Sequence, residues 1–147
     1  MLAESILALA RRTFDEIWNT GNLDVADELF SPDYVNHDPT SPEVPPGPEG
    51  VKQLARMYRR AFPDLRFIID EMLATGDRVI TRWTGQGTHR GPLRGLPATG
   101  RQARVTGISI HRIAGGRIVE TWLNWDTLGL MEQLGAAPVP ARRSVGR

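Results

Sequence analysis

The chain of 147 residues contains no cysteine, so disulfide bonds and thiolate catalysis are excluded. This absence is compatible with the cytoplasm, which is the location we expect. No apolar run approaches the ~20 residues that a membrane-spanning helix needs. The apolar stretch near the N-terminus carries Glu4 and has no basic segment before it, so we do not interpret it as a signal peptide.

An excess of charge of one sign is also lacking. Eighteen Lys and Arg residues face 17 Asp and Glu residues, which leaves a net charge of +1 and no electrostatic case for nucleic acid or an anionic membrane as partner. The hydrophobic content of 40% and the charged content of 24% are those of an ordinary globular protein. We predict one domain over residues 1–135 and a flexible tail over 136–147.

Helical periodicity dominates the first half of the chain. Apolar residues recur at steps of three and four through residues 2–18, which predicts an amphipathic helix. Asn22 can cap a short second helix, which the Ser31-Pro32-Asp33 sequence ends. A third helix is predicted over 48–62, because Pro48 suits a first helical position. The region that contains residues 34–39 is expected to be a short extended piece.

The second half of the chain changes to a strand pattern. Hairpin-type turns at Gly76-Asp77 and Gly115-Gly116 separate strands that we predict over 66–75, 79–89, 101–113 and 117–125. A short helix over 127–134 follows and ends at Gly135. Helices followed by hairpin-linked strands predict an α+β fold. A four-strand antiparallel meander covered on one face by three helices would curl into a cone.

One candidate acid stands at the end of the last predicted strand. Asp126 is a possible general acid/base, because a carboxylate against an apolar wall can both remove and return a proton. Trp122 and Asn124 have the same parity along the strand and should share its face, so we expect both to contact a ligand. The alternative is that Asp126 only caps the helix that begins at Thr127.

A second candidate lies on the neighbouring predicted strand. His111 alternates with Ser109 and Gly107, and these small residues should leave room for a ligand in front of that face. A neutral imidazole there can polarise a carbonyl. The alternative is a histidine that is bonded within the sheet. We count His111 as catalytic and Ser109 as ligand-binding.

The remaining candidates surround the expected pocket. His37 and Asp38 precede a proline-rich loop, where they form either the pocket mouth or a simple turn. His89 opens the glycine-rich run 87–101, which we interpret as the rim of the pocket. Tyr58 is expected to line the pocket, although an aromatic residue at helical spacing more often packs in the core. Three histidines and two aspartates fit no local ligand spacing, so we predict no metal.

The order of these motifs resembles the SnoaL-like polyketide cyclases and the related ester cyclases, within the nuclear transport factor 2-like fold. The resemblance covers nearly the whole of 1–135, and it implies a cone-shaped α+β barrel with a deep pocket. The family closes rings by intramolecular aldol condensation without a cofactor, and the matches to its acid/base residue and pocket histidine are Asp126 and His111. The motifs that carry the resemblance are Asn36-His37-Asp38-Pro39, Ala61-Phe62-Pro63-Asp64-Leu65, Gly76-Asp77-Arg78-Val79, Gly87-Thr88-His89, Pro97-Ala98-Thr99-Gly100-Arg101, Gly116-Arg117-Ile118-Val119-Glu120-Thr121-Trp122, Asp126 and Gln133-Leu134-Gly135.

Several functions share this fold. We expect an acid/base enzyme that acts on a small apolar carbonyl compound. The alternatives are a non-catalytic protein that binds small hydrophobic ligands, and an isomerase or an epoxide hydrolase-like enzyme; a hydrolase would need an Asp–Arg–Asp set, for which Asp70 and Arg82 are candidates. We also predict a homodimer, because the outer face of the sheet should expose Ile108, Ile110 and Leu123.

Overall fold

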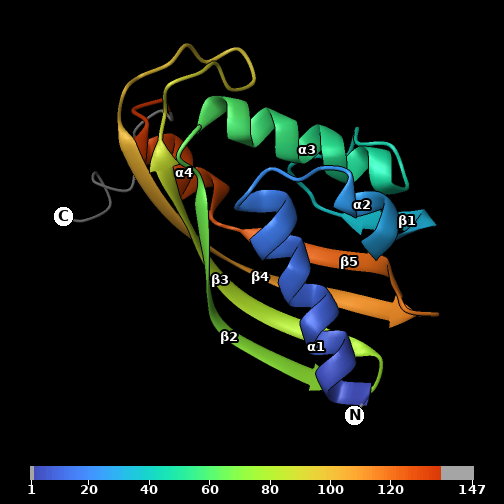
Figure 1. Ribbon diagram of the computed structural model, residues 1–147. Helices are drawn as coiled ribbons and strands as arrows, with labels where there is room; N and C mark the ends of the chain where they lie inside the picture. Colours follow the sequence, from blue (N-terminus) through green and yellow to red (C-terminus); the bar gives the residue numbers. More distant parts are fainter. Residues whose placement is uncertain (1, 137–147) are drawn as a thin grey trace.

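The computed structural model of the protein describes residues 2–136, so the predicted tail lies outside the described residues from 137 onward. A strongly curved sheet forms one layer and the helices form the other (Figure 1). The helical segments are α1 (Leu2–Arg12), η1 (Thr13–Trp18), α2 (Val25–Leu29), α3 (Pro48–Ala61) and α4 (Thr127–Gln133). The strands are β1 (Phe30–His37), β2 (Arg66–Thr75), β3 (Arg78–Thr88), β4 (Gln102–Ala114) and β5 (Arg117–Trp125).

Within residues 2–136 the sheet has five strands in the order β1-β5-β4-β3-β2, which confirms the α+β class. Strands β2 to β5 form the predicted antiparallel meander. The segment predicted only as a short extended piece belongs to β1, which pairs with β5 in parallel and adds a fifth strand at the edge. The long α3 crosses between β1 and the meander, as a connection out of a parallel pair requires.

The N-terminal helices pack on the concave face of the sheet (Figure 1). Ile6, Ala10 and Ile17 are buried there, in a core that includes Leu29 and Val79. After Arg12 the first helix continues as the π-helical turns of η1. Wide turns of this kind are rare and often occur at functional sites, because they re-aim side chains that a regular helix would place elsewhere.

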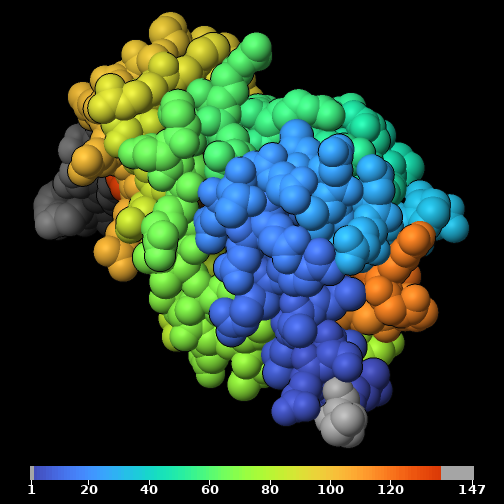
Figure 2. Space-filling model, viewed as in Figure 1, coloured from blue at the N-terminus to red at the C-terminus, as the bar shows by residue number. Residues whose placement is uncertain are grey.

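A second apolar cluster closes the other end of the cone. It joins Phe62 at the end of α3, Leu93 in the hairpin over 89–101, and Leu130 in α4. The ends of that hairpin are held by His89 N–H to the Arg101 carbonyl and by Gly100 N–H to the His89 carbonyl, both at 2.8 Å. Figure 2 shows this hairpin, in yellow, projecting beside the end of α3.

The outer, convex face of the sheet bears exposed apolar side chains. Ile108 and Leu73 are 50% and 53% exposed, and Ile110 is half-buried. Pairing of two copies through this face stays a prediction. Among the described residues, none of the helices has both the length and the apolar character to cross a membrane.

Candidate functional site

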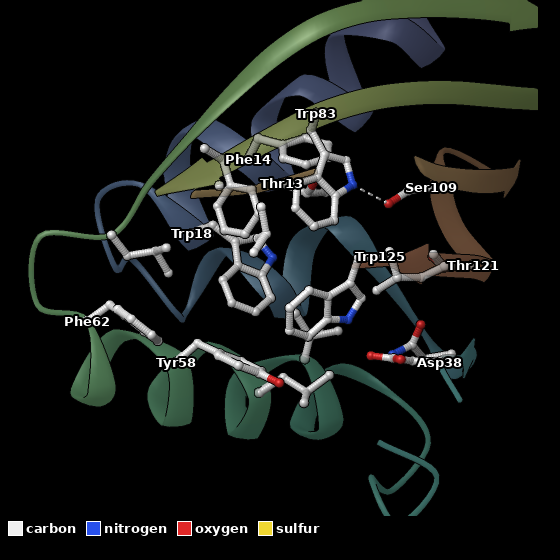
Figure 3. Close-up of a pocket in the computed structure, with 18 of the residues that line it drawn as sticks. Thr13, Phe14, Trp18, Asp38, Tyr58, Phe62, Trp83, Ser109, Thr121 and Trp125 are labelled. Atoms are coloured by element: carbon white, nitrogen blue, oxygen red, sulfur yellow. Dashed lines mark hydrogen bonds between the residues drawn. The ribbon is translucent and has the colours of Figure 1, made fainter. Parts of the chain in front are cut away.

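A largely apolar cavity lies between the concave face of the sheet and the helices. It has a volume of about 140 Å³, and its mainly apolar and aromatic lining with a few polar groups is typical of a ligand pocket. Figure 3 shows rings that converge on it from the helices and from the sheet. The aromatic lining residues are Phe14, Trp18, Phe30, Tyr34, Tyr58, Phe62, Phe67, Trp83 and Trp125.

The ring of Trp83 forms part of the sheet side of this cavity. Its indole N–H donates a hydrogen bond of 3.0 Å to the Ser109 hydroxyl, and it packs edge-on against Phe67 with the ring centroids 4.9 Å apart. A β-carbon at Gly107 would collide with this indole. The space that small residues were expected to leave in front of Gly107 is therefore filled by Trp83, whereas Ser109 lines the cavity as predicted.

Asp38 is the carboxylate of the cavity: among the described residues that line it, none of the others is acidic. It follows β1 directly and is 6% exposed. One carboxylate oxygen accepts hydrogen bonds from the Thr40 N–H at 2.9 Å and from the Thr40 hydroxyl at 2.7 Å. Figure 3 places Asp38 across the cavity from Phe62. A carboxylate held in this way, facing an apolar space, is suited to proton transfer.

His111 lines the cavity as predicted, and it is almost completely buried. Burial lowers the pKa of its imidazole to about 4, so the ring is neutral near pH 7. Its Nδ1 has no hydrogen-bond partner in the described structure. Thr121 lies directly opposite His111 in the sheet and also lines the cavity. An unpaired buried polar atom such as the His111 Nδ1 is available to a ligand oxygen.

His111 should make folding stability depend on pH. The pKa is about 6.5 when exposed and about 4 in the fold, so the unfolded chain takes up the proton first as the pH falls. The contribution of neutral His111 to the stability of the fold is therefore complete above pH 6.5 and is lost as the pH falls toward 4. Relative to His111→Asn, the wild-type protein should lose about 2 kcal/mol more unfolding free energy between pH 7 and pH 5, measured by urea denaturation. Equal losses in the two proteins would contradict this assignment.

Two tyrosine hydroxyls add donors to the wall. Burial raises the pKa of Tyr34 and also that of Tyr58, and both residues line the cavity. Each hydroxyl therefore keeps its proton at neutral pH and can donate a hydrogen bond. Tyr58 was predicted to line the pocket, and it does so from α3, with its ring edge-on to Trp125 at 5.9 Å.

Asp126 lies outside the cavity. Its carboxylate accepts a hydrogen bond of 2.8 Å from the Gly129 N–H at the start of α4, and the residue is exposed. The structure therefore corresponds to the capping alternative. None of Asp126, Trp122 and Asn124 lines the cavity, so the inference that their side of β5 faces the pocket was wrong.

The side of β5 that carries the odd-numbered residues faces the cavity. Thr121, Leu123 and Trp125 line it, so Leu123 is not on the outer face where we expected it. Trp122 and Asn124 point away from the cavity. Trp122 stacks on His37 with the ring centroids 5.3 Å apart.

His37 also faces away from the cavity. It pairs with Glu120 at 2.7 Å on the far side of the sheet, whereas Asp38 lines the cavity. In this part of the chain, alternation along β1 brings Asn36 and Asp38 to the cavity. This alternation is the signal in the sequence that could have separated Asp38 from its neighbour.

His89 is fully buried under the hairpin 89–101 and does not line the cavity. Its Nδ1 accepts a hydrogen bond of 3.2 Å from the Thr99 N–H, and its ring packs on Phe62 at 5.4 Å. The side chain thus ties the two arms of the hairpin together and does not form a rim contact. Residues 2–136 contain no group of three or more His, Asp or Glu side chains that lie close enough together to hold a metal ion.

The Asp–Arg–Asp set considered for a hydrolase does not form in the cavity. Asp70 accepts a hydrogen bond of 2.6 Å from the Thr84 hydroxyl, and Arg82 pairs with Glu71 at 3.3 Å. Neither residue lines the cavity.

Residues 8–134 match the family model described as SnoaL-like polyketide cyclase. The nogalonic acid methyl ester cyclase of Streptomyces nogalater is 30% identical over 120 residues, which are 80% of this chain and 89% of that protein. The aklanonic acid methyl ester cyclase DnrD of Streptomyces peucetius is 34% identical over 130 residues, 84% of this chain and 87% of that protein.

The fold is also similar to those of solved structures. TsrD from Streptomyces laurentii superimposes with a TM-score of 0.83 at 32% identity, covering 91% of this chain and 97% of that one. The match to the family model, the two methyl ester cyclases and the shared fold agree over nearly the same residues. The chain belongs to the SnoaL-like polyketide cyclase family.

Proposed function

We propose that this protein catalyses a cofactor-independent, aldol-type ring closure of an apolar, polyketide-like carbonyl compound or ester. The observation that carries the proposal is the carboxylate of Asp38, the one acidic side chain among the described residues that line the aromatic cavity. The membership of the family and two relatives whose names specify methyl ester cyclases support the same reaction class. The substrates in those names, nogalonic and aklanonic acid methyl esters, are therefore the first to test.

In the proposed reaction Asp38 removes a proton from the carbon that lies between two carbonyl groups. The carbanion attacks a ketone carbon of the same molecule, which forms one carbon–carbon bond and an alkoxide. The proton held by Asp38 returns to that alkoxide, so the product is an isomer of the substrate. Asp38 takes the acid/base role that the sequence assigned to Asp126, because only the former carboxylate meets the cavity.

The polar groups on the sheet can stabilise the negative charge that forms on the substrate. Negative charge develops on oxygen during the reaction, and donors fixed in a low-dielectric site stabilise such charge strongly. The neutral His111 and the Thr121 hydroxyl lie next to each other on β4 and β5, and both residues line the cavity. We assign them to the substrate oxygen, while the aromatic walls hold the rings of the substrate and exclude water.

The test is to incubate the purified protein with each methyl ester and to follow formation of the ring-closed isomer by chromatography and NMR. Turnover above the uncatalysed rate is expected without added metal or cofactor. Quenching of tryptophan fluorescence by the ester without any turnover would contradict the enzyme proposal and would favour the ligand-binding alternative. Trp18, Trp83 and Trp125 line the cavity and serve as the probe.

Two neighbouring substitutions should show that the ester binds in this cavity. Leu123 faces the cavity and Asn124 is exposed on the other side of β5. Leu123→Lys places a cation in an apolar wall, and we expect ester affinity to fall by about tenfold or more. Asn124→Lys adds the same charge outside and should leave affinity unchanged. Fluorescence titration measures both, and equal affinities in the two variants would place binding elsewhere.

A further inference from the structure

Arg94 has an unfavourable backbone conformation. Among residues 2–136 it is the one non-glycine residue with positive φ, at 46°. With Gly95, at φ 85°, it forms the tip of the hairpin 89–101, where Leu93 and Leu96 exchange N–H to carbonyl bonds of 2.9 and 2.8 Å. A two-residue turn with positive φ at both positions favours Asn, Asp or Gly at the first of them. Local preference therefore does not explain an arginine here.

The side chain of Arg94 reaches the loop that follows β1. Its Nη2 donates a hydrogen bond of 2.8 Å to the Ser41 hydroxyl, and its guanidinium lies 3.4 Å from the Glu43 carboxylate. Ser41 is 2% exposed whereas Arg94 is exposed, so this bond is partly shielded from water. The contacts join two segments that are separated by more than 50 residues in the sequence.

Ser41 belongs to the turn that fixes Asp38. The Ser41 N–H donates to the Asp38 carbonyl at 3.0 Å, and the Thr40 N–H and hydroxyl donate to the Asp38 carboxylate. Through Ser41, Arg94 thus holds the turn that orients the carboxylate. The same guanidinium acts on Tyr58 of the cavity wall: burial raises the pKa of that hydroxyl, and the charge of Arg94 offsets part of the rise.

We propose that Arg94 is a positioning residue for the reaction, which clamps the Asp38 turn against the hairpin 89–101 and so fixes the carboxylate at the cavity. This inference rests on the proposed function, because it assigns Asp38 as the base. The strained turn then has a reason: only a long, forked cation at the hairpin tip reaches Ser41 and Glu43 together.

Arg94→Asn tests the clamp, because asparagine suits the backbone of the turn but cannot reach Ser41. We expect kcat to fall by about tenfold to hundredfold, as for other displacements of a catalytic group, while Tm stays level or rises. Arg94→Lys should recover part of the rate. The matched control is Arg56→Gln, which removes an exposed cation from α3 outside the turn and should leave both kcat and Tm unchanged. Full activity in Arg94→Asn, or a fall in Tm together with activity, would overturn the proposal.

A double-substitution cycle tests whether Arg94 acts through Asp38. In the Asp38→Asn background, Arg94→Asn should lower kcat no further, and Ser41→Ala alone should reproduce the effect of Arg94→Asn. An additional, independent loss in the double variant would overturn the assigned route.

Amide hydrogen exchange separates this inference from the proposed function, because it needs no turnover. In Arg94→Asn the Thr40 and Ser41 amides should exchange about tenfold faster or more, since the clamp no longer holds their bonds to Asp38. Unchanged exchange would overturn the clamp even in an active enzyme. If wild-type protein shows no turnover but Arg94→Asn shows faster exchange, the proposed function fails and the clamp stands.

Discussion

Replacing Asp38 with asparagine is expected to lower kcat for ring closure by about 10² to 10⁴-fold, the usual contribution of a general base. The amide cannot take a proton from carbon. Its oxygen can still accept the two hydrogen bonds from Thr40, so the turn should keep its shape and the protein its stability. Turnover of the methyl esters and urea unfolding of the same preparations measure the two effects.

Asp126→Ala should affect stability and not turnover, which is the opposite of the effect expected for Asp38→Asn. It removes the acceptor for the Gly129 N–H, so we expect a loss of about 1 kcal/mol in unfolding free energy with kcat unchanged. If Asp126→Ala abolished turnover and Asp38→Asn did not, the acid/base role would return to Asp126 and the assignment made from the cavity would be wrong. The pair thus separates a catalytic carboxylate from a capping one.

Much of the fold followed from local patterns in the sequence. Helices over 2–18 and 48–62 and the meander after residue 66 were predictable, because amphipathic periods and hairpin glycines act within a few residues. His111 and Ser109 were placed on the cavity side by simple alternation along one long strand. Tyr58, which was expected to line the pocket, lies in the cavity wall.

The errors arose where a placement depends on contacts far apart in the sequence. The parallel pairing of β1 with β5 joins residues more than 80 positions apart, and no local pattern specifies it. The side of β5 that faces the cavity was inferred from the expected catalytic role of Asp126, whose carboxylate instead caps α4. The role of Arg94 was invisible as well, because its contacts with Ser41 exist only after the hairpin folds back onto the first loop.

Trp83→Ala should be the most destabilising substitution in the cavity wall. Trp83 is 5% exposed and packs on Phe67, so its loss leaves a cavity and an unpaired Ser109 hydroxyl. We expect a cost of about 3 to 5 kcal/mol in unfolding free energy by urea denaturation. A cost under 1 kcal/mol would mean that the indole does not pack as described.

Gly107 should show the reverse problem, which is overpacking. It lies directly opposite Trp83 on one side and Trp125 on the other, so an added methyl group at Gly107 meets both side chains. Gly107→Ala should therefore cost about 1 to 3 kcal/mol. In the Trp83→Phe background the smaller ring leaves room, and the same change should cost at least about 0.5 kcal/mol less, the usual sign of coupling between neighbours in contact. Additive costs would show that the methyl group and the indole do not compete for one space, and the glycine would then need another explanation.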